Sequence, residues 1–115
     1  MKKVTLNVLV YFYLRNPVTG ETMLELPLPQ EQTGYVVEEQ PYADRTTLVV
    51  YQDKDSSLWR VVEYTTGNNM AIEPQPTREE AIKAVCDFLN DTDKDVEDFL
   101  KVIAECEVLN QPLVE

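Results

Sequence analysis

The carboxylates at residues 91–95 have the spacing in this chain that comes nearest to a known chemistry. The segment Asp91-Thr92-Asp93-Lys94-Asp95 places an acid at every second position, as in the first three ligand positions of an EF-hand calcium loop. Such a loop also requires glycine at its sixth position and a bidentate glutamate at its twelfth, where this chain has Val96 and Val102. We therefore interpret the segment as the acidic first turn of a helix, and we predict no metal site.

Other residues that could carry chemistry are few. The chain has no histidine, which excludes serine–histidine and cysteine–histidine nucleophile pairs and histidine-based zinc sites. Its two cysteines, Cys86 and Cys106, fall on apolar helical stripes in an acidic neighbourhood, so we interpret them as buried side chains rather than as a redox pair or a reactive thiol. Its three glycines are too far apart for a dinucleotide or phosphate loop, and we predict no cofactor.

Paired carboxylates of the kind that glycoside hydrolases use occur at Asp53 with Asp55 and at Glu38 with Glu39. Both pairs fall in predicted loops. Catalysis would require one acid of a pair to lie in a desolvating pocket that raises its pKa. No feature of the sequence indicates such a pocket, so we predict that the protein is not an enzyme.

Charge is the most unusual property of the composition. The 115 residues include 21 acidic and 10 basic ones, which gives a net charge of −11. Residues 73–115 hold 12 of these acids and 4 of the bases, so the C-terminal third alone carries −8. This charge repels phosphate backbones and anionic membranes, so we expect no direct nucleic acid and no membrane binding, and a basic protein is the complementary partner. The alternative is that the charge only keeps the protein soluble.

The N-terminal segment does not have the pattern of a signal peptide. Two lysines precede an apolar run, but Thr5 and Asn7 interrupt the run and Arg15 ends it, with no small-residue cleavage site after it. No stretch approaches the roughly 20 apolar residues of a membrane span. We expect a cytoplasmic protein that folds as a single domain over residues 1–115.

Alternation of apolar and polar residues predicts an antiparallel sheet within residues 3–72. Residues 4–14 alternate with the period of a strand, and the apolar character of both faces favours a central position in the sheet. A returning strand is expected at residues 23–28. Pro27 and Pro29 lack amide protons, so this strand should lie at an edge or end there.

The rest of the predicted sheet is a meander. Residues 29–45 are expected to form a loop over one edge, with a short strand at residues 35–37 as the alternative. The β-rich runs 47–52 and 58–65, separated by turn-forming residues, predict a hairpin. A short further strand is expected at residues 70–72.

After Pro76 the apolar period changes to that of a helix. Thr77-Arg78-Glu79-Glu80 has the pattern of a capping box and predicts a helix over residues 78–89, and a similar start predicts a second helix over residues 93–107. The short connection favours a helical hairpin. The predicted fold is therefore α+β, an antiparallel sheet of about four to six strands covered on one face by this hairpin.

Two surfaces are candidates for binding a partner. The first is the outer face of the helical hairpin, with the acids Glu79, Glu80, Asp87, Asp91, Glu97, Asp98 and Glu105. The second is a tyrosine-rich sheet face with Tyr11, Tyr13 and Tyr51. Exposed aromatic residues are typical of protein interfaces. The alternatives are a merely solvated helical face, and a second core in which residues 21–45 cover the tyrosines.

These features favour a non-catalytic protein-binding module. Our hypothesis is a small acidic inhibitor or antagonist of the phage or mobile-element anti-defence type, which engages a basic, nucleic-acid-binding protein as a nucleic-acid mimic does. One alternative is a toxin-neutralising immunity protein that acts by the same acidic complementarity. Another is a homodimer, an accessory protein that associates through its tyrosine-rich sheet face.

Overall fold

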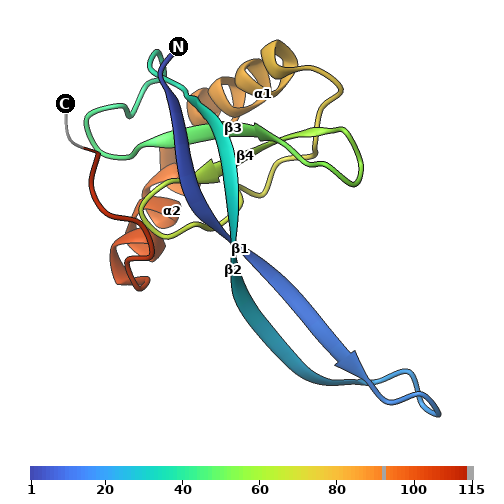
Figure 1. The fold of residues 1–115 in the computed structure, drawn as a ribbon. Helices are drawn as coiled ribbons and strands as arrows, with labels where there is room; N and C mark the ends of the chain where they lie inside the picture. Colours follow the sequence, from blue (N-terminus) through green and yellow to red (C-terminus); the bar gives the residue numbers. More distant parts are fainter. Residues whose placement is uncertain (92, 114–115) are drawn as a thin grey trace.

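The chain forms a four-stranded antiparallel sheet followed by two helices, which confirms the predicted α+β class. A computed structural model describes residues 1–91 and 93–113. The strands pair in the order β1-β2-β3-β4, and the helices follow them at the C-terminal end of the chain (Figure 1). The elements are β1 (Lys3–Arg15), β2 (Thr22–Val36), β3 (Leu48–Gln52), β4 (Trp59–Glu63), α1 (Arg78–Asp91) and α2 (Asp93–Glu105).

The first two strands differ from the prediction. β1 covers the predicted run 4–14 but lies at an edge of the sheet, so the prediction of a central position is wrong. Its second face carries Tyr11 and Tyr13, which lie on the part of the strand that projects beyond the sheet. The apolar character of that face therefore does not reflect burial between two neighbouring strands. β2 continues through residues 29–36, which the sequence predicts as a loop, because pairing with β1 satisfies its backbone while its polar side chains face solvent.

The β3–β4 hairpin is confirmed, whereas the predicted strand at residues 70–72 is not formed. The chain makes only an isolated bridge there, between Val62 and Asn69, and the Met70 amide donates to the Val61 carbonyl at 2.8 Å. Pro74 lacks an amide proton and cannot extend such a ladder.

The β3–β4 hairpin lies between two apolar layers. On one face its side chains join those of α1 and α2 in a cluster that includes Leu48, Val50, Val61, Ala81, Val85, Leu89, Val96 and Leu100. On the other face they join the side chains of β1 in a cluster that includes Val4, Leu6, Val8, Val49, Tyr51 and Val62. This arrangement is possible because β2 pairs with β3 only over residues 34–36, so that the β1–β2 ribbon crosses the hairpin (Figure 1).

The helices begin where the sequence predicts. The Thr77 hydroxyl accepts a hydrogen bond from the Glu80 amide at 3.2 Å, which is the expected N-terminal cap of α1. α1 ends at Asp91, two residues later than predicted, and α2 ends at Glu105, two residues earlier. The second predicted cap involves Thr92, which lies outside the described residues.

The longest feature of the molecule is a two-stranded arm, defined here as residues 10–28; the rest of the protein is called the body. In the arm β1 and β2 continue beyond the body, paired from Val10 opposite Leu28 to Leu14 opposite Leu24. Gly20, with φ of 74°, lies in the connecting turn. Beyond Tyr11, whose hydroxyl donates to Asn68 of the body at 3.0 Å, the arm projects as a two-stranded ribbon (Figure 1), and the molecule measures 48 × 30 × 28 Å.

Candidate protein-interaction surfaces

The described residues of the acid-rich segment 91–95 belong to two helices. Asp91 is the last residue of α1, and Asp93 is the first residue of α2. Thr92 and the side chains of Asp93 and Lys94 lie outside the described part. Among the residues that the structure describes, no group of three or more histidine, cysteine or acidic side chains is placed to hold a metal ion.

The two cysteines are unpaired thiols, each half-buried. The Cys86 thiol donates a hydrogen bond to the Glu39 carbonyl at 3.7 Å and packs against the core cluster formed with the helices. Burial raises the pKa of the Cys86 thiol, and the neighbouring Asp87 carboxylate raises it further. These surroundings disfavour the reactive thiolate.

Cys86 is therefore expected to react slowly with a disulfide reagent at neutral pH. In a Cys106→Ser variant, the remaining thiol should react more slowly than free cysteine, because its raised pKa leaves less of it ionised. The rate should rise with pH beyond the point where free cysteine has levelled off. Absorbance at 412 nm after addition of Ellman's reagent measures it, and a rate at pH 7 equal to that of free cysteine contradicts the prediction.

The seven predicted helical acids fall into two groups. Three of them form ion pairs at the protein surface: Glu97 with Arg45, Asp87 with Lys83, and Glu79 with Arg78. The Arg45 guanidinium donates to both Glu97 oxygens, at 2.8 and 3.3 Å, and this hydrogen bonding lowers the pKa of the Glu97 carboxyl. The other four make no ion pair within the described part of the chain: Glu80, Asp91, Asp98 and Glu105.

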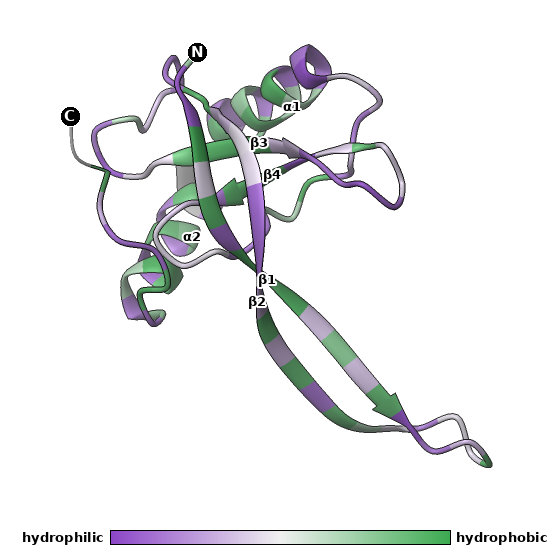
Figure 2. Cartoon of the chain, in the orientation of Figure 1, coloured by the Kyte–Doolittle hydropathy of each residue, from purple (hydrophilic) through white to green (hydrophobic). Residues whose placement is uncertain are grey.

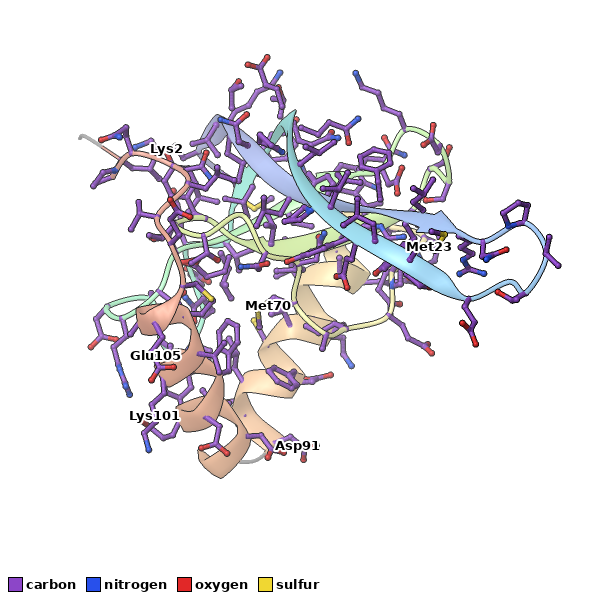
Figure 3. The ribbon with its side chains drawn as sticks, turned by 90° about the horizontal axis from the view of Figure 1, so that it is seen from below. Lys2, Met23, Met70, Asp91, Lys101 and Glu105 are labelled. Atoms are coloured by element: carbon purple, nitrogen blue, oxygen red, sulfur yellow. The ribbon has the colours of Figure 1, made fainter. Side chains whose placement is uncertain are left out.

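The helix termini show which of these acids the fold itself favours. Glu79 and Glu80 lie in the first turn of α1, where the helix dipole stabilises a negative charge. Glu105 is instead the last residue of α2, a helix with no basic residue in its last turn. Figure 3 shows Lys101 and Glu105 on the side of α2 that faces away from α1. The charge of Glu105 therefore opposes the helix dipole.

The three tyrosines of the second candidate surface differ in exposure, although Tyr11 and Tyr51 line one hollow. Tyr11 and Tyr13 are 42% and 54% exposed on the arm, and residues 22–28 run beside them as the second strand rather than covering them. Tyr51 is only 4% exposed, because its side chain lies on the face of β3 that β1 covers. Burial raises the pKa of its hydroxyl, which donates to Asn69 at 2.8 Å. Tyr51 is therefore removed from the candidate surface.

The most exposed apolar surface is one that the sequence pattern did not predict. Directly paired residues of an antiparallel ladder share a face, so one face of the arm carries only apolar side chains: Val10, Phe12, Leu14, Leu24, Leu26 and Leu28. Phe12 and Leu14 are 53% and 59% exposed. Apolar residues alternate along both strands of the arm (Figure 2). The signal in the sequence is the matching alternation on either side of the turn at residues 16–21.

A polar hollow lies where the arm leaves the body. It is lined by Val10, Gln30, Gln32, Asp53, Asp55 and Arg60, among others. Asp53 pairs with Arg60 at 3.2 Å, and the hydrogen bond from the Asp55 amide is the main cause that lowers the pKa of the Asp53 carboxyl. Stability from this lowered pKa is present above the ordinary aspartate pKa and is lost as the pH falls through the lowered value.

The buried Glu63 side chain stabilises a turn of the body next to the start of the arm. The Glu63 carboxylate, 1% exposed, accepts hydrogen bonds from the Thr65 and Thr66 amides at 3.0 and 2.9 Å and from the Thr66 hydroxyl at 3.1 Å. In the same turn, the Gly67 carbonyl accepts from the Leu9 amide at 2.7 Å. Glu63 thereby holds the turn that ties down β1 at the start of the arm.

Asn110 takes the place of a neighbouring strand at the outer edge of β1. Its Oδ1 accepts from the Asn7 amide at 2.7 Å, and its Nδ2 donates to the Asn7 carbonyl at 2.8 Å and to the Tyr64 carbonyl at 2.6 Å. The C-terminal segment is thereby fixed to both β1 and the end of β4. Strand alternation carries no signal for such a contact, because the two residues are 103 positions apart.

Comparisons with known proteins give no indication of the function. No protein-family model matches the chain, and no curated protein or solved structure is significantly similar to it. Neither described helix is long and apolar enough to cross a membrane.

Proposed function

We propose that the protein is a non-catalytic protein-binding module of the inhibitor or antagonist type, which engages a basic protein. The observation that carries this proposal is Glu105, an exposed carboxylate at the C-terminal end of α2, where the helix dipole disfavours it. Residues that cost the free protein stability are typical of functional surfaces. A cationic group of a partner relieves this cost on binding. The net charge of −11 supports a basic partner.

The contact is placed on the outer side of α2. Glu97 is already paired with Arg45, whereas Asp98 and Glu105 make no ion pair with another residue that the structure describes. Net charge attracts a basic protein over a Debye length of about 8 Å at physiological ionic strength. Association is therefore expected to slow steeply as salt is added.

Two classes of basic target fit this proposal. A nucleic-acid-binding protein of a defence system is one such target, and the acidic surface then acts as a nucleic-acid mimic. A basic toxin is another, and the protein is then an immunity protein. The genomic neighbourhood separates the two, because an adjacent toxin gene supports the second.

Glu105→Lys is expected to stabilise the free protein by about 0.3–1 kcal/mol, because it replaces an unfavourable interaction with the helix dipole by a favourable one. Urea denaturation measures the change. Glu80→Lys is the matched control, since Glu80 is exposed in the first turn of α1 and the same reversal there should lower stability by a similar amount. A Glu105→Lys variant less stable than the native chain contradicts the argument.

Binding is tested by affinity capture from a host lysate at low salt, followed by titration of the purified partner. A variant with Asp98→Lys and Glu105→Lys should bind the recovered basic protein at least about tenfold more weakly, although its fold is no less stable. Capture of no basic protein at low salt counts against the proposal. So does a double variant that binds as tightly as the native chain.

A further inference from the structure

The apolar face of the arm is largely exposed to solvent. On β1 the same face is covered near the body, where Val8 is 1% exposed, and uncovered along the arm, where Phe12 is 53% exposed. An isolated two-stranded hairpin is at best marginally stable in water. The six apolar side chains together offer roughly 500 Å² of exposed surface, at the upper end for the largest apolar patch of a monomeric protein. We infer that this face is a homodimer interface, covered by the arm of a second copy of the chain.

The area fits a second arm as the cover. Two such faces in contact bury on the order of 1,000 Å², which is the lower bound for a specific protein–protein interface. In the dimer the two arms lie face to face and point in opposite directions, related by a two-fold axis near the Phe12–Leu26 pair. Each side chain of one arm then faces the apolar face of the other, as in two packed sheets.

The distribution of charge also favours a second copy. The arm contains one basic residue, Arg15, and two acidic ones, Glu21 and Glu25, so it carries −1 of the net charge of −11. The body carries the remaining −10. Opposed arms keep the two bodies about 20 Å apart, which exceeds the Debye length of about 8 Å, so their repulsion is largely screened. The arm is thus the surface through which two such acidic chains can meet.

In this dimer, the tip of one arm is complementary in charge to the base of the other arm. Arg15, at the tip, is the only basic residue between Lys3 and Arg45. Opposed arms centred on Phe12 bring Arg15 of the partner subunit level with Leu9, at the hollow that Asp53 and Asp55 line. Asp53 is paired with Arg60, and Asp55 has no ion pair within the described part of the chain. Asp55 is therefore the carboxylate that receives the arginine.

Sedimentation equilibrium of the full chain tests the interface. Over about 1–100 μM, a range that covers typical dimer affinities, the native protein should form dimers. A Phe12→Ser, Leu26→Ser variant should weaken dimerisation by about 100-fold or more. The matched control is Tyr13→Ser with Glu25→Ser, a neighbouring cross-strand pair on the opposite face of the arm, which should change the affinity less than about threefold. Thermal unfolding verifies that the body of each variant stays folded.

Three results overturn the inference. They are a native chain that remains monomeric over the whole range, an apolar-face variant that still dimerises, and a control that dissociates equally. The direction of the arms has its own test. Arg15→Asp and Asp55→Arg should each weaken the dimer by about threefold to tenfold, and the two together should restore it. If the combined variant is weaker than either single one, the opposed arrangement is wrong.

The interface is independent of the proposed function. It uses the arm, whereas the basic partner is placed on α2. A monomeric chain leaves the Glu105 experiments unaffected, and a dimer that captures no basic protein leaves the arm interface intact.

Discussion

A Glu63→Ala variant is expected to lose about 3 kcal/mol of unfolding free energy, the largest loss for any single polar side chain of this protein. The substitution removes a fully buried carboxylate and leaves the Thr65 and Thr66 amides and the Thr66 hydroxyl without their acceptor. Buried donors that lose a partner cost the desolvation of each group, and the missing side-chain atoms leave a cavity. Urea denaturation followed by far-UV circular dichroism measures the loss.

Two further variants separate the lost hydrogen bonds from the mere loss of an acidic side chain. Glu63→Gln keeps the volume of the side chain but replaces one acceptor oxygen by a donor, so it should lose about half as much. Glu73→Ala removes an exposed acid and should change stability by less than about 0.5 kcal/mol. If Glu63→Ala is as stable as Glu73→Ala, the three hydrogen bonds do not hold the turn.

A Gly34→Ala variant is expected to lose about 3 kcal/mol or to misfold, because β2 and β3 approach too closely there for a side chain. A Cβ atom on Gly34 would lie 2.5 Å from the Val50 carbonyl oxygen and 2.8 Å from Val49 Cγ1. The first contact is with backbone, which cannot rotate away, so the β2–β3 pairing that joins the β1–β2 ribbon to the rest of the sheet must open. Thermal unfolding of the purified variant measures the effect.

Gly20→Ala is the matched control. A Cβ atom there meets nothing within 4 Å, but φ of 74° is unfavourable for alanine. The expected cost is about 1 kcal/mol, confined to the tip of the arm, with the melting temperature of the body unchanged. Equal losses for the two variants would show that crowding at the β2–β3 crossing is not the cause at Gly34.

The helices and the β3–β4 hairpin could be predicted from the sequence because their signals are local. The three-and-four spacing of Ala81, Val85 and Leu89 defines a helix face, and all three residues are buried. Thr77 directly precedes that helix and marks its start. The alternation of residues 47–52 and 58–65, with a turn between them, needs no information from the rest of the chain.

The position of β1 and the length of β2 could not be predicted, because they depend on what lies against each face. Val8 and Phe12 occupy the same face of one strand with the same alternation, yet one is covered by the body and the other extends past it. Residues 29–33 are mostly polar and adopt a strand because β1 supplies partners roughly 20 to 28 positions earlier in the chain.

The same limit applies to the candidate site. Tyr11 and Tyr51 both lie on predicted strands. Periodicity does not show that β3, the strand of Tyr51, lies beneath β1. Glu105 could be identified as an acid but not as the end of a helix, because the prediction extended α2 to residue 107. The apolar face of the arm depends on the register of β1 with β2, which the alternation along each strand does not fix by itself.

The contact of Asn110 with Asn7 has a consequence for the integrity of the chain. Asn110 closes the backbone of β1 at the point where the strand would otherwise offer its free edge to solvent. Proteolysis before residue 110 would uncover the edge of β1 at Asn7, two residues before the Leu9 amide that donates to the Gly67 carbonyl. An open edge on an apolar strand is a template for pairing with further chains, and such pairing propagates into fibrils. The C-terminal segment therefore shields this part of the β1 edge from pairing with other chains.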